Sequence, residues 1–122
     1  MIVPGGDARI AITTAGSREE AEQIARALVE ERLAACVNLL PGVTSVYRWR
    51  GEMETAEEVL LLIKTTAERL EELEAAVRRL HSYEVPEFVV VHPEAMGKAY
   101  LEWMEGCVTP LSGGAGRHSD TK

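Results

Sequence analysis

The segment 81–87, His-Ser-Tyr-Glu-Val-Pro-Glu, holds the densest group of chemically capable side chains in this sequence. It places an imidazole, a phenol and two carboxylates between an expected helix and an expected strand. Imidazole and carboxylate groups bind borderline divalent cations, so His81 and Glu87 are candidate metal ligands. A histidine also suits the last turn of a helix, where it interacts favourably with the helix dipole. The spacing alone leaves both interpretations open.

Five further side chains are candidates for lining a binding cleft: Cys36, Trp49, Lys64, Tyr83 and Trp103. A buried cysteine packs as a small hydrophobic group, whereas a thiolate ligand needs a cationic or metal neighbour. A lysine that ends an apolar strand either extends to the rim or binds an anion. Trp49 lies between two arginines and is suited to stacking at an interface, whereas Trp103 favours packing. No Gly-rich phosphate loop, HExxH or GxSxG motif occurs, so we do not expect an enzyme.

Composition and charge restrict the class of partner. The chain has 122 residues, of which 46% are hydrophobic, and a formal net charge of −7. This is the size of one compact domain. Its acidic balance argues against non-specific binding to nucleic acid or to anionic membranes. The two cysteines form no CxxC pair, and neither a secretory signal nor a membrane-length apolar run is present. We therefore expect a cytoplasmic protein without nucleic-acid or membrane partners.

Hydrophobic periodicity and turn signals predict the order β-α-β-β-α-β, followed by a third helix. The expected strands are 8–14, 34–50, 57–65 and 87–92, and the expected helices are 18–32, about 66–81 and 97–105. This order is typical of an α+β ferredoxin-like sandwich. We expect a single domain over residues 1–107 and a flexible tail over 108–122, because the tail is rich in glycine and polar residues.

Capping signals place the starts of the first two helices. Ser17 is followed three residues later by Glu20, and Thr65 in the same way by Glu68. Both pairs match the capping box, in which a hydroxyl and a carboxylate satisfy free backbone N–H groups reciprocally. The sequence therefore predicts a capping box at each of these helix starts.

The two middle strands form an unusually long hairpin, and the inner strands carry no polar alternation. Pro41 and Gly42 predict a bulge in the first arm, and Gly51 and Glu52 predict the turn. Residues 59–63 and 88–91 are apolar throughout, so we expect both faces of these strands to be buried away from water. Two helices cover only one face of a sheet. The second face therefore requires a partner chain, which predicts a tight homo-oligomer.

Five blocks of this sequence resemble the CutA family of divalent-cation tolerance proteins, in the right order between about residue 8 and residue 106. The blocks are LAACVN at 33–38, PGVTSVYRW at 41–49, KTT at 64–66 with Glu58 ahead of it, HSYEVPE at 81–87 and YLEW at 100–103. The resemblance implies a ferredoxin-like subunit in a stable homotrimer, with strand pairing between subunits through the long hairpin. It also implies clefts between subunits and a role in tolerance of copper and other divalent cations, with Cu(II) bound by some members.

Two positions depart from the copper-binding members of that family. Those members carry a cysteine at the position of Thr13 and a second histidine at the position of Leu80. A hydroxyl and a single imidazole are a harder and weaker ligand set than a thiolate with two imidazoles. Cys36, His81 and Glu87 remain as candidate ligands for Cu(II) or another divalent cation.

Two other functions fit the same predicted fold. A PII-like signalling module would bind a small anion or nucleotide through Lys64, although the hairpin turn is too short for a long signalling loop. An acylphosphatase-like enzyme would need an arginine in an anion-binding loop after the first strand, and residues 14–17 supply none. With the CutA resemblance as the guide, we expect a non-enzymatic homotrimer that binds copper or another divalent cation weakly in a cleft between subunits.

Overall fold

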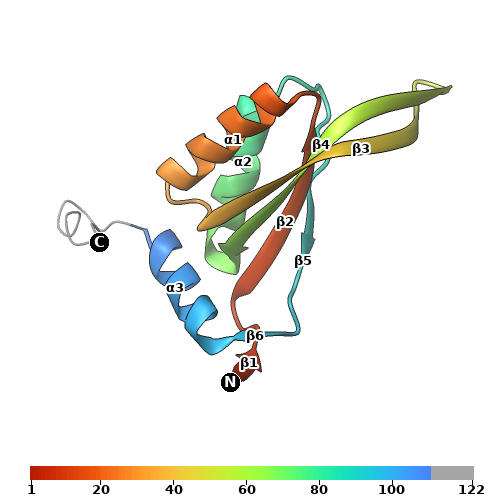
Figure 1. The fold of residues 1–122 in the computed structure, drawn as a ribbon. Helices are drawn as coiled ribbons and strands as arrows, with labels where there is room; N and C mark the ends of the chain where they lie inside the picture. The colour runs from red at the N-terminus through yellow and green to blue at the C-terminus, as the bar shows by residue number, and fades with distance from the viewer. Residues whose placement is uncertain (111–122) are drawn as a thin grey trace.

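The computed structural model describes residues 1–110, which form two antiparallel sheets and three helices (Figure 1). The strands are β1 (Ile2–Pro4), β2 (Ala8–Ala15), β3 (Cys36–Trp49), β4 (Glu52–Thr66), β5 (Val89–Val91) and β6 (Ala95–Gly97). The helices are α1 (Arg18–Glu30), α2 (Leu70–Leu80) and α3 (Lys98–Val108), and a 3-10 turn covers Ala67–Arg69. None of the helices in this part of the chain is long and apolar enough to cross a membrane. The expected tail lies outside the described residues except for 108–110, and of these Val108 ends α3 and is buried.

The larger sheet has the strand order β3-β4-β2-β5, and every neighbouring pair is antiparallel. Helices α1 and α2 lie together on one of its faces (Figure 1). This arrangement confirms the predicted ferredoxin-like α+β sandwich. Strands β1 and β6 pair in a separate two-stranded ribbon, which was not predicted because three-residue strands are too short to show a periodic pattern.

The core forms where the apolar stripes of α1 and α2 meet one face of the sheet. Its largest fully buried side chains are Ile24 and Leu28 from α1, Leu61 and Ile63 from β4, and Leu73 and Val77 from α2. The helical residues recur at intervals of four, which places them on one side of each helix. Alternate residues of β4 face the same way, so this core uses one face of the sheet only.

The long hairpin is present, and its irregularities have local causes. The register of β3 against β4 shifts between Leu40 and Val43, and Gly42 has a φ of +80°, which confirms the predicted bulge. The turn lies at Arg50 and Gly51, whose φ values are +53° and +84°. Two positive φ values in succession are typical of a type I′ hairpin turn. The turn is therefore one residue earlier than expected, and β4 begins at Glu52 instead of residue 57.

Of the two predicted capping boxes, the first forms only its hydroxyl half, because the Glu20 carboxylate accepts from the Ser82 N–H instead. Ser17 Oγ accepts a hydrogen bond from the Glu20 N–H at 3.1 Å. The second prediction was wrong, because the N-cap of the 3-10 turn is Thr66 and makes no side-chain cap. Thr65 is fully buried, and its Oγ1 donates instead to the carbonyl oxygen of Leu33 at 2.7 Å. Its hydroxyl thus joins β4 to the segment after α1.

The sheet face opposite α1 and α2, called the outer face here, is apolar and incompletely covered. Ile12 lies between Leu62 on β4 and Val89 on β5 in the sheet register. Helix α3 covers one end of this face by packing Leu101 and Met104 near Ala8. Beyond α3, the outer face carries an apolar area, called the outer patch here, which consists of Ile12, Leu40, Leu60, Leu62, Val89 and Val91. Within it, Leu40, Val89 and Val91 are 41%, 47% and 42% exposed.

Thr13 offers a direct test of packing in the core. Its side chain is fully buried, and its Oγ1 has no hydrogen-bond partner. A buried hydroxyl without a partner is destabilising, so Thr13→Val is expected to raise the free energy of unfolding by about 1 kcal/mol. Thr65→Val is the matched control, because it removes a buried hydrogen bond and is expected to lower that free energy by about 1–2 kcal/mol. Urea denaturation followed by circular dichroism measures both, and equal losses in the two variants would contradict this account.

Candidate functional site

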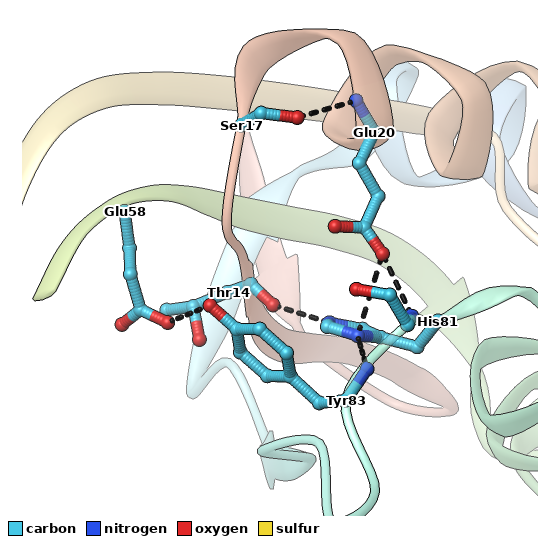
Figure 2. Close-up of polar contacts among 7 residues, drawn as sticks. Thr14, Ser17, Glu20, Glu58, His81 and Tyr83 are labelled. Carbon is cyan, nitrogen blue, oxygen red and sulfur yellow. Dashed lines mark hydrogen bonds and ion pairs between the residues drawn. The ribbon is translucent and has the colours of Figure 1, made fainter.

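His81 fastens the segment 81–87 to the end of β2 (Figure 2). Its side chain is fully buried. Its Nε2 donates to the carbonyl oxygen of Thr14 at 2.6 Å, and its Nδ1 accepts from the backbone N–H of Tyr83 at 3.1 Å. A nitrogen that accepts and a nitrogen that donates define a neutral imidazole with its proton on Nε2. His81 therefore orders the loop through both nitrogens.

Glu20 supports the same loop from the first turn of α1. One of its carboxylate oxygens accepts from the backbone N–H of Ser82 at 2.8 Å and lies 3.6 Å from His81 Nδ1. Burial by itself raises the pKa of Glu20, but the hydrogen bonds from Ser82, together with smaller contributions from His81 and Gly16, hold that pKa below its ordinary value. The ionised carboxylate is therefore part of the folded structure, and it ties the start of α1 to the end of α2.

Tyr83 carries this order outward to Glu58 on β4. The phenol donates to a carboxylate oxygen of Glu58 at 2.7 Å (Figure 2). A Cβ added to Gly16 would lie 3.2 Å from that phenol oxygen, so glycine at position 16 leaves the space that the ring needs. Burial, followed by the hydrogen bond and charge of Glu58, raises the pKa of Tyr83, which stays protonated and able to donate.

These contacts form one wall of a pocket of about 690 Å³, called the acidic pocket here. It is lined by Thr14, Ser45, Val46, Tyr47, Trp49, Glu58, Tyr83, Glu84, Val85 and Glu87. The lining therefore includes three carboxylates and no lysine, arginine or histidine. Glu58 is only 8% exposed, although it carries a carboxylate. At the rim, Arg50 Nη2 donates to Glu84 at 2.9 Å, and both of these side chains are well exposed.

The structure divides the residues that the sequence suggested for a cleft into two groups. Trp49, Tyr83 and Glu87 line the acidic pocket. Cys36 and Lys64 are cross-strand neighbours near the opposite end of β3, where Lys64 Nζ donates to Asn38 Oδ1 at 2.6 Å. Trp103 lies on α3, half exposed, and lines a separate hollow that also contains Cys107.

The expected copper ligands do not come together within the chain. Both ring nitrogens of His81 already have partners, whereas Glu87 lies on the surface of the acidic pocket. Thr13 is buried in register with Leu61 on the helix-covered face, while Cys36 pairs with Lys64 on the outer face. Across residues 1–110, no group of three His, Cys, Asp or Glu side chains is placed to hold a metal ion. The donors of one chain therefore do not fit a resident copper ion.

Three residues that line the pocket were not among the site residues predicted from the sequence, namely Tyr47, Glu58 and Glu84. Strand alternation contained part of the signal, because Ser45, Tyr47 and Trp49 share one side of β3. The bulge then brings Val43, on that same side, into register with Glu58. What the sequence did not show was that the segment 81–87 folds back against this side of the hairpin.

A family model and individual sequences of known proteins all match the chain under the same family name. Residues 9–107 match the family described as CutA1 divalent ion tolerance protein. The divalent-cation tolerance protein CutA of Thermus thermophilus is 48% identical over 95 residues, which are 78% of this chain and 92% of that protein. Protein CutA of Homo sapiens is 43% identical over 88% of this chain and 60% of its own length.

Solved structures agree with these sequence matches. The Cut A1 structure from Thermus thermophilus superposes with a TM-score of 0.82 at 45% identity, covering 84% of this chain and 99% of that one. The CutA structure from Synechococcus elongatus superposes with a TM-score of 0.85 at 36% identity, covering 89% and 96%. Sequence and fold therefore point to the same group of proteins.

The role of Glu20 predicts how stability depends on pH. Because its folded pKa is lowered, its contribution is present above the ordinary value of 4.5 and is lost as the pH falls through the folded pKa. Glu20→Gln is expected to lower the free energy of unfolding by about 1–2 kcal/mol at pH 7, with a smaller difference towards pH 3. Glu19→Gln is the control, since Glu19 is exposed in the same turn. Urea titrations at several pH values measure the effect, and a difference that is constant with pH would rule out this role.

Proposed function

The chain belongs to the CutA1 family of divalent ion tolerance proteins, and we propose that it acts in that tolerance as a homotrimer that binds a cation in the acidic pocket. The observation that carries the proposal is the charge of the lining. Glu58, Glu84 and Glu87 face one pocket, and no basic side chain lines it. Such a lining attracts cations and repels anions.

Glu58 makes the strongest part of this argument. A carboxylate is costly to bury unless it is both hydrogen-bonded and paired with a positive charge. The Tyr83 hydroxyl supplies a hydrogen bond, and no salt bridge within residues 1–110 includes Glu58. The charge that is missing would come from a bound cation. Carboxylate and phenol oxygens suit hard or borderline divalent ions, whereas the engaged imidazole of His81 would take no part.

The homotrimer is supported by the outer patch. Exposed valines on β5 and an exposed leucine on β3 adjoin the half-buried Ile12, Leu60 and Leu62 in a continuous apolar area. Contiguous apolar areas of this kind are usually covered by another protein surface. Glu58, Leu60 and Leu62 alternate along the same face of β4, so the acidic pocket borders this area. A neighbouring subunit on the outer patch would therefore close one side of the pocket.

A binding protein is a better description than an enzyme, and the anion-binding alternative lacks support. His81 is held through both nitrogens, so it is not available as a general base. Lys64 lies outside the acidic pocket and is hydrogen-bonded to Asn38. At the start of α1, Ser17 caps the Glu20 N–H, and the carboxylate of Glu20 lies in the same turn, where its charge is unfavourable for a phosphate. The two free thiols, Cys36 and Cys107, are consistent with a cytoplasmic location.

The oligomer is tested by placing a charge in the outer patch. Leu62→Lys is expected to convert the trimer to smaller species, because the lysine would be buried against an apolar partner surface. Sedimentation velocity on the wild-type protein and the variant measures the change. Val29→Lys is the matched control, since Val29 is 43% exposed on α1 and lies outside the patch. A wild-type protein that sediments as a monomer would overturn this part of the proposal.

Cation binding is tested with Glu58→Gln, which keeps the shape and removes the charge. Isothermal titration with Mn(II) and with Cu(II) is expected to show at least about a tenfold weaker affinity in the variant, equivalent to 1.4 kcal/mol. Glu57→Gln is the matched control, because Glu57 is exposed and its carboxylate accepts from Thr44 outside the pocket. Identical titrations for the wild type and Glu58→Gln would show that the cation does not use the pocket.

A further inference from the structure

The acidic pocket has aromatic walls as well as carboxylates. Tyr47 and Trp49 line it from β3, and Tyr83 lines it from the loop. Tyr47 is 44% exposed and Trp49 is 39% exposed, so parts of their rings are accessible. Aromatic faces attract cations through the negative potential above the ring. They supply no ligand atom to a metal ion, so they add little to binding of a hydrated divalent cation.

At the rim of the pocket, a weakly hydrated cation, the guanidinium of Arg50, already contacts the lining. The guanidinium carbon of Arg50 lies 5.2 Å from the centre of the Trp49 ring, and Arg50 Nη2 lies 2.9 Å from a carboxylate oxygen of Glu84. One cation therefore contacts an aromatic face and a carboxylate together. The Arg50 and Glu84 side chains are 69% and 70% exposed, and exposed ion pairs contribute only about 0–1 kcal/mol. A ligand could displace Arg50 at little cost.

The part of the pocket around Glu58 also combines a carboxylate with aromatic side chains, and the residues that line the pocket include no lysine or arginine. Glu58 is nine-tenths buried, its partner is the neutral Tyr83 hydroxyl, and Glu87 makes no ion pair among the described residues. A pocket of about 690 Å³ is also far larger than a single metal ion needs. The space, the rings and the buried carboxylate together suit a cation that has an apolar surface of its own.

We infer that the acidic pocket binds an organic ammonium ion, with its charged centre near Glu58 and Glu87 and its alkyl groups against Tyr47 and Trp49. This inference rests on the proposed cation site and specifies the class of ligand for it. An alkylated ammonium group combines charge with weak hydration, so it gains from the carboxylates and from the rings. Ammonium recognition by aromatic cages uses the same two contributions.

Choline and its uncharged isostere 3,3-dimethyl-1-butanol are the probes. Isothermal titration of the intact protein in cacodylate buffer, which contains neither amines nor phosphate, is expected to show binding of choline and at least tenfold weaker binding of the alcohol. Glu58→Gln is expected to reduce choline affinity at least about tenfold, and Trp49→Leu about two- to fivefold. Trp103→Leu, which alters a half-exposed tryptophan outside the pocket, is expected to leave the affinity unchanged.

Arg50 provides a variant that should improve binding. Arg50→Asn removes the competing guanidinium, and asparagine tolerates the positive φ at this position. Choline affinity is therefore expected to increase by up to about fivefold, the value of the exposed ion pair. A decrease in affinity would show that Arg50 belongs to the binding site and would contradict this arrangement.

Parallel titrations with Mn(II) separate the two levels of the proposal. If Mn(II) binds in a Glu58-dependent way and choline does not bind, the ammonium inference fails and the divalent-cation site stands. If neither binds, both fail. Equal binding of choline and the uncharged alcohol would reduce the pocket to an apolar surface and overturn the inference. Dissociation of the Glu58→Gln trimer in sedimentation, with no choline binding by the wild type, would assign the pocket to a basic side chain of a neighbouring subunit.

Discussion

The hydrogen bond from His81 Nε2 to the carbonyl oxygen of Thr14 is the contact on which the rest of the site depends. It fixes the end of α2 against the end of β2 and sets the proton position in the ring. The other ring nitrogen can then accept from the backbone of Tyr83, which aims the phenol at Glu58. One buried histidine thus orders a wall of the acidic pocket, although His81 itself is not among the residues that line it. Both ring nitrogens are used, Nε2 as a donor and Nδ1 as an acceptor, so the ring has no nitrogen left for another partner.

The two faces of the sheet have different physical roles. One face is covered by α1 and α2 and forms a core from regularly spaced leucine, isoleucine, valine and alanine residues. The outer face is apolar at Leu60 and Leu62 of β4, between Glu58 and Lys64, and is covered only at one end, by α3. Burial of apolar area contributes about 25 cal/mol per Å², so a small domain gains considerably by covering the second face. The acidic pocket lies at the edge of that face, where a neighbouring chain would exclude water and strengthen its electrostatic interactions.

This chain belongs to the CutA1 family, yet it does not bring the expected copper ligands together. The fold and about four fifths of the chain agree with the CutA1 relatives. Within the chain, however, the thiol and the imidazole do not meet: Cys36 faces outward and His81 is engaged, while the hard hydroxyl of Thr13 faces the core. Hard carboxylate oxygens are concentrated in the acidic pocket instead. The side chains that line the pocket therefore offer hard oxygen atoms and no thiol, thioether or imidazole.

The sequence by itself determined the order of the sandwich strands and of the helices, the fold class and the bulge, because periodicity, Pro41 and Gly42 are local signals, but it did not determine the short β1–β6 ribbon. It also suggested the segment 81–87 and Trp49 as site candidates, and Trp49 and part of that segment line the acidic pocket. Only the tertiary structure decided which members of that segment face the pocket. His81 is buried while Glu87 lines the surface, and Glu58 joins them from a strand that is distant in sequence. The reason is physical: local patterns state which groups a segment carries, whereas the partners that satisfy a buried imidazole or carboxylate are chosen by packing between segments.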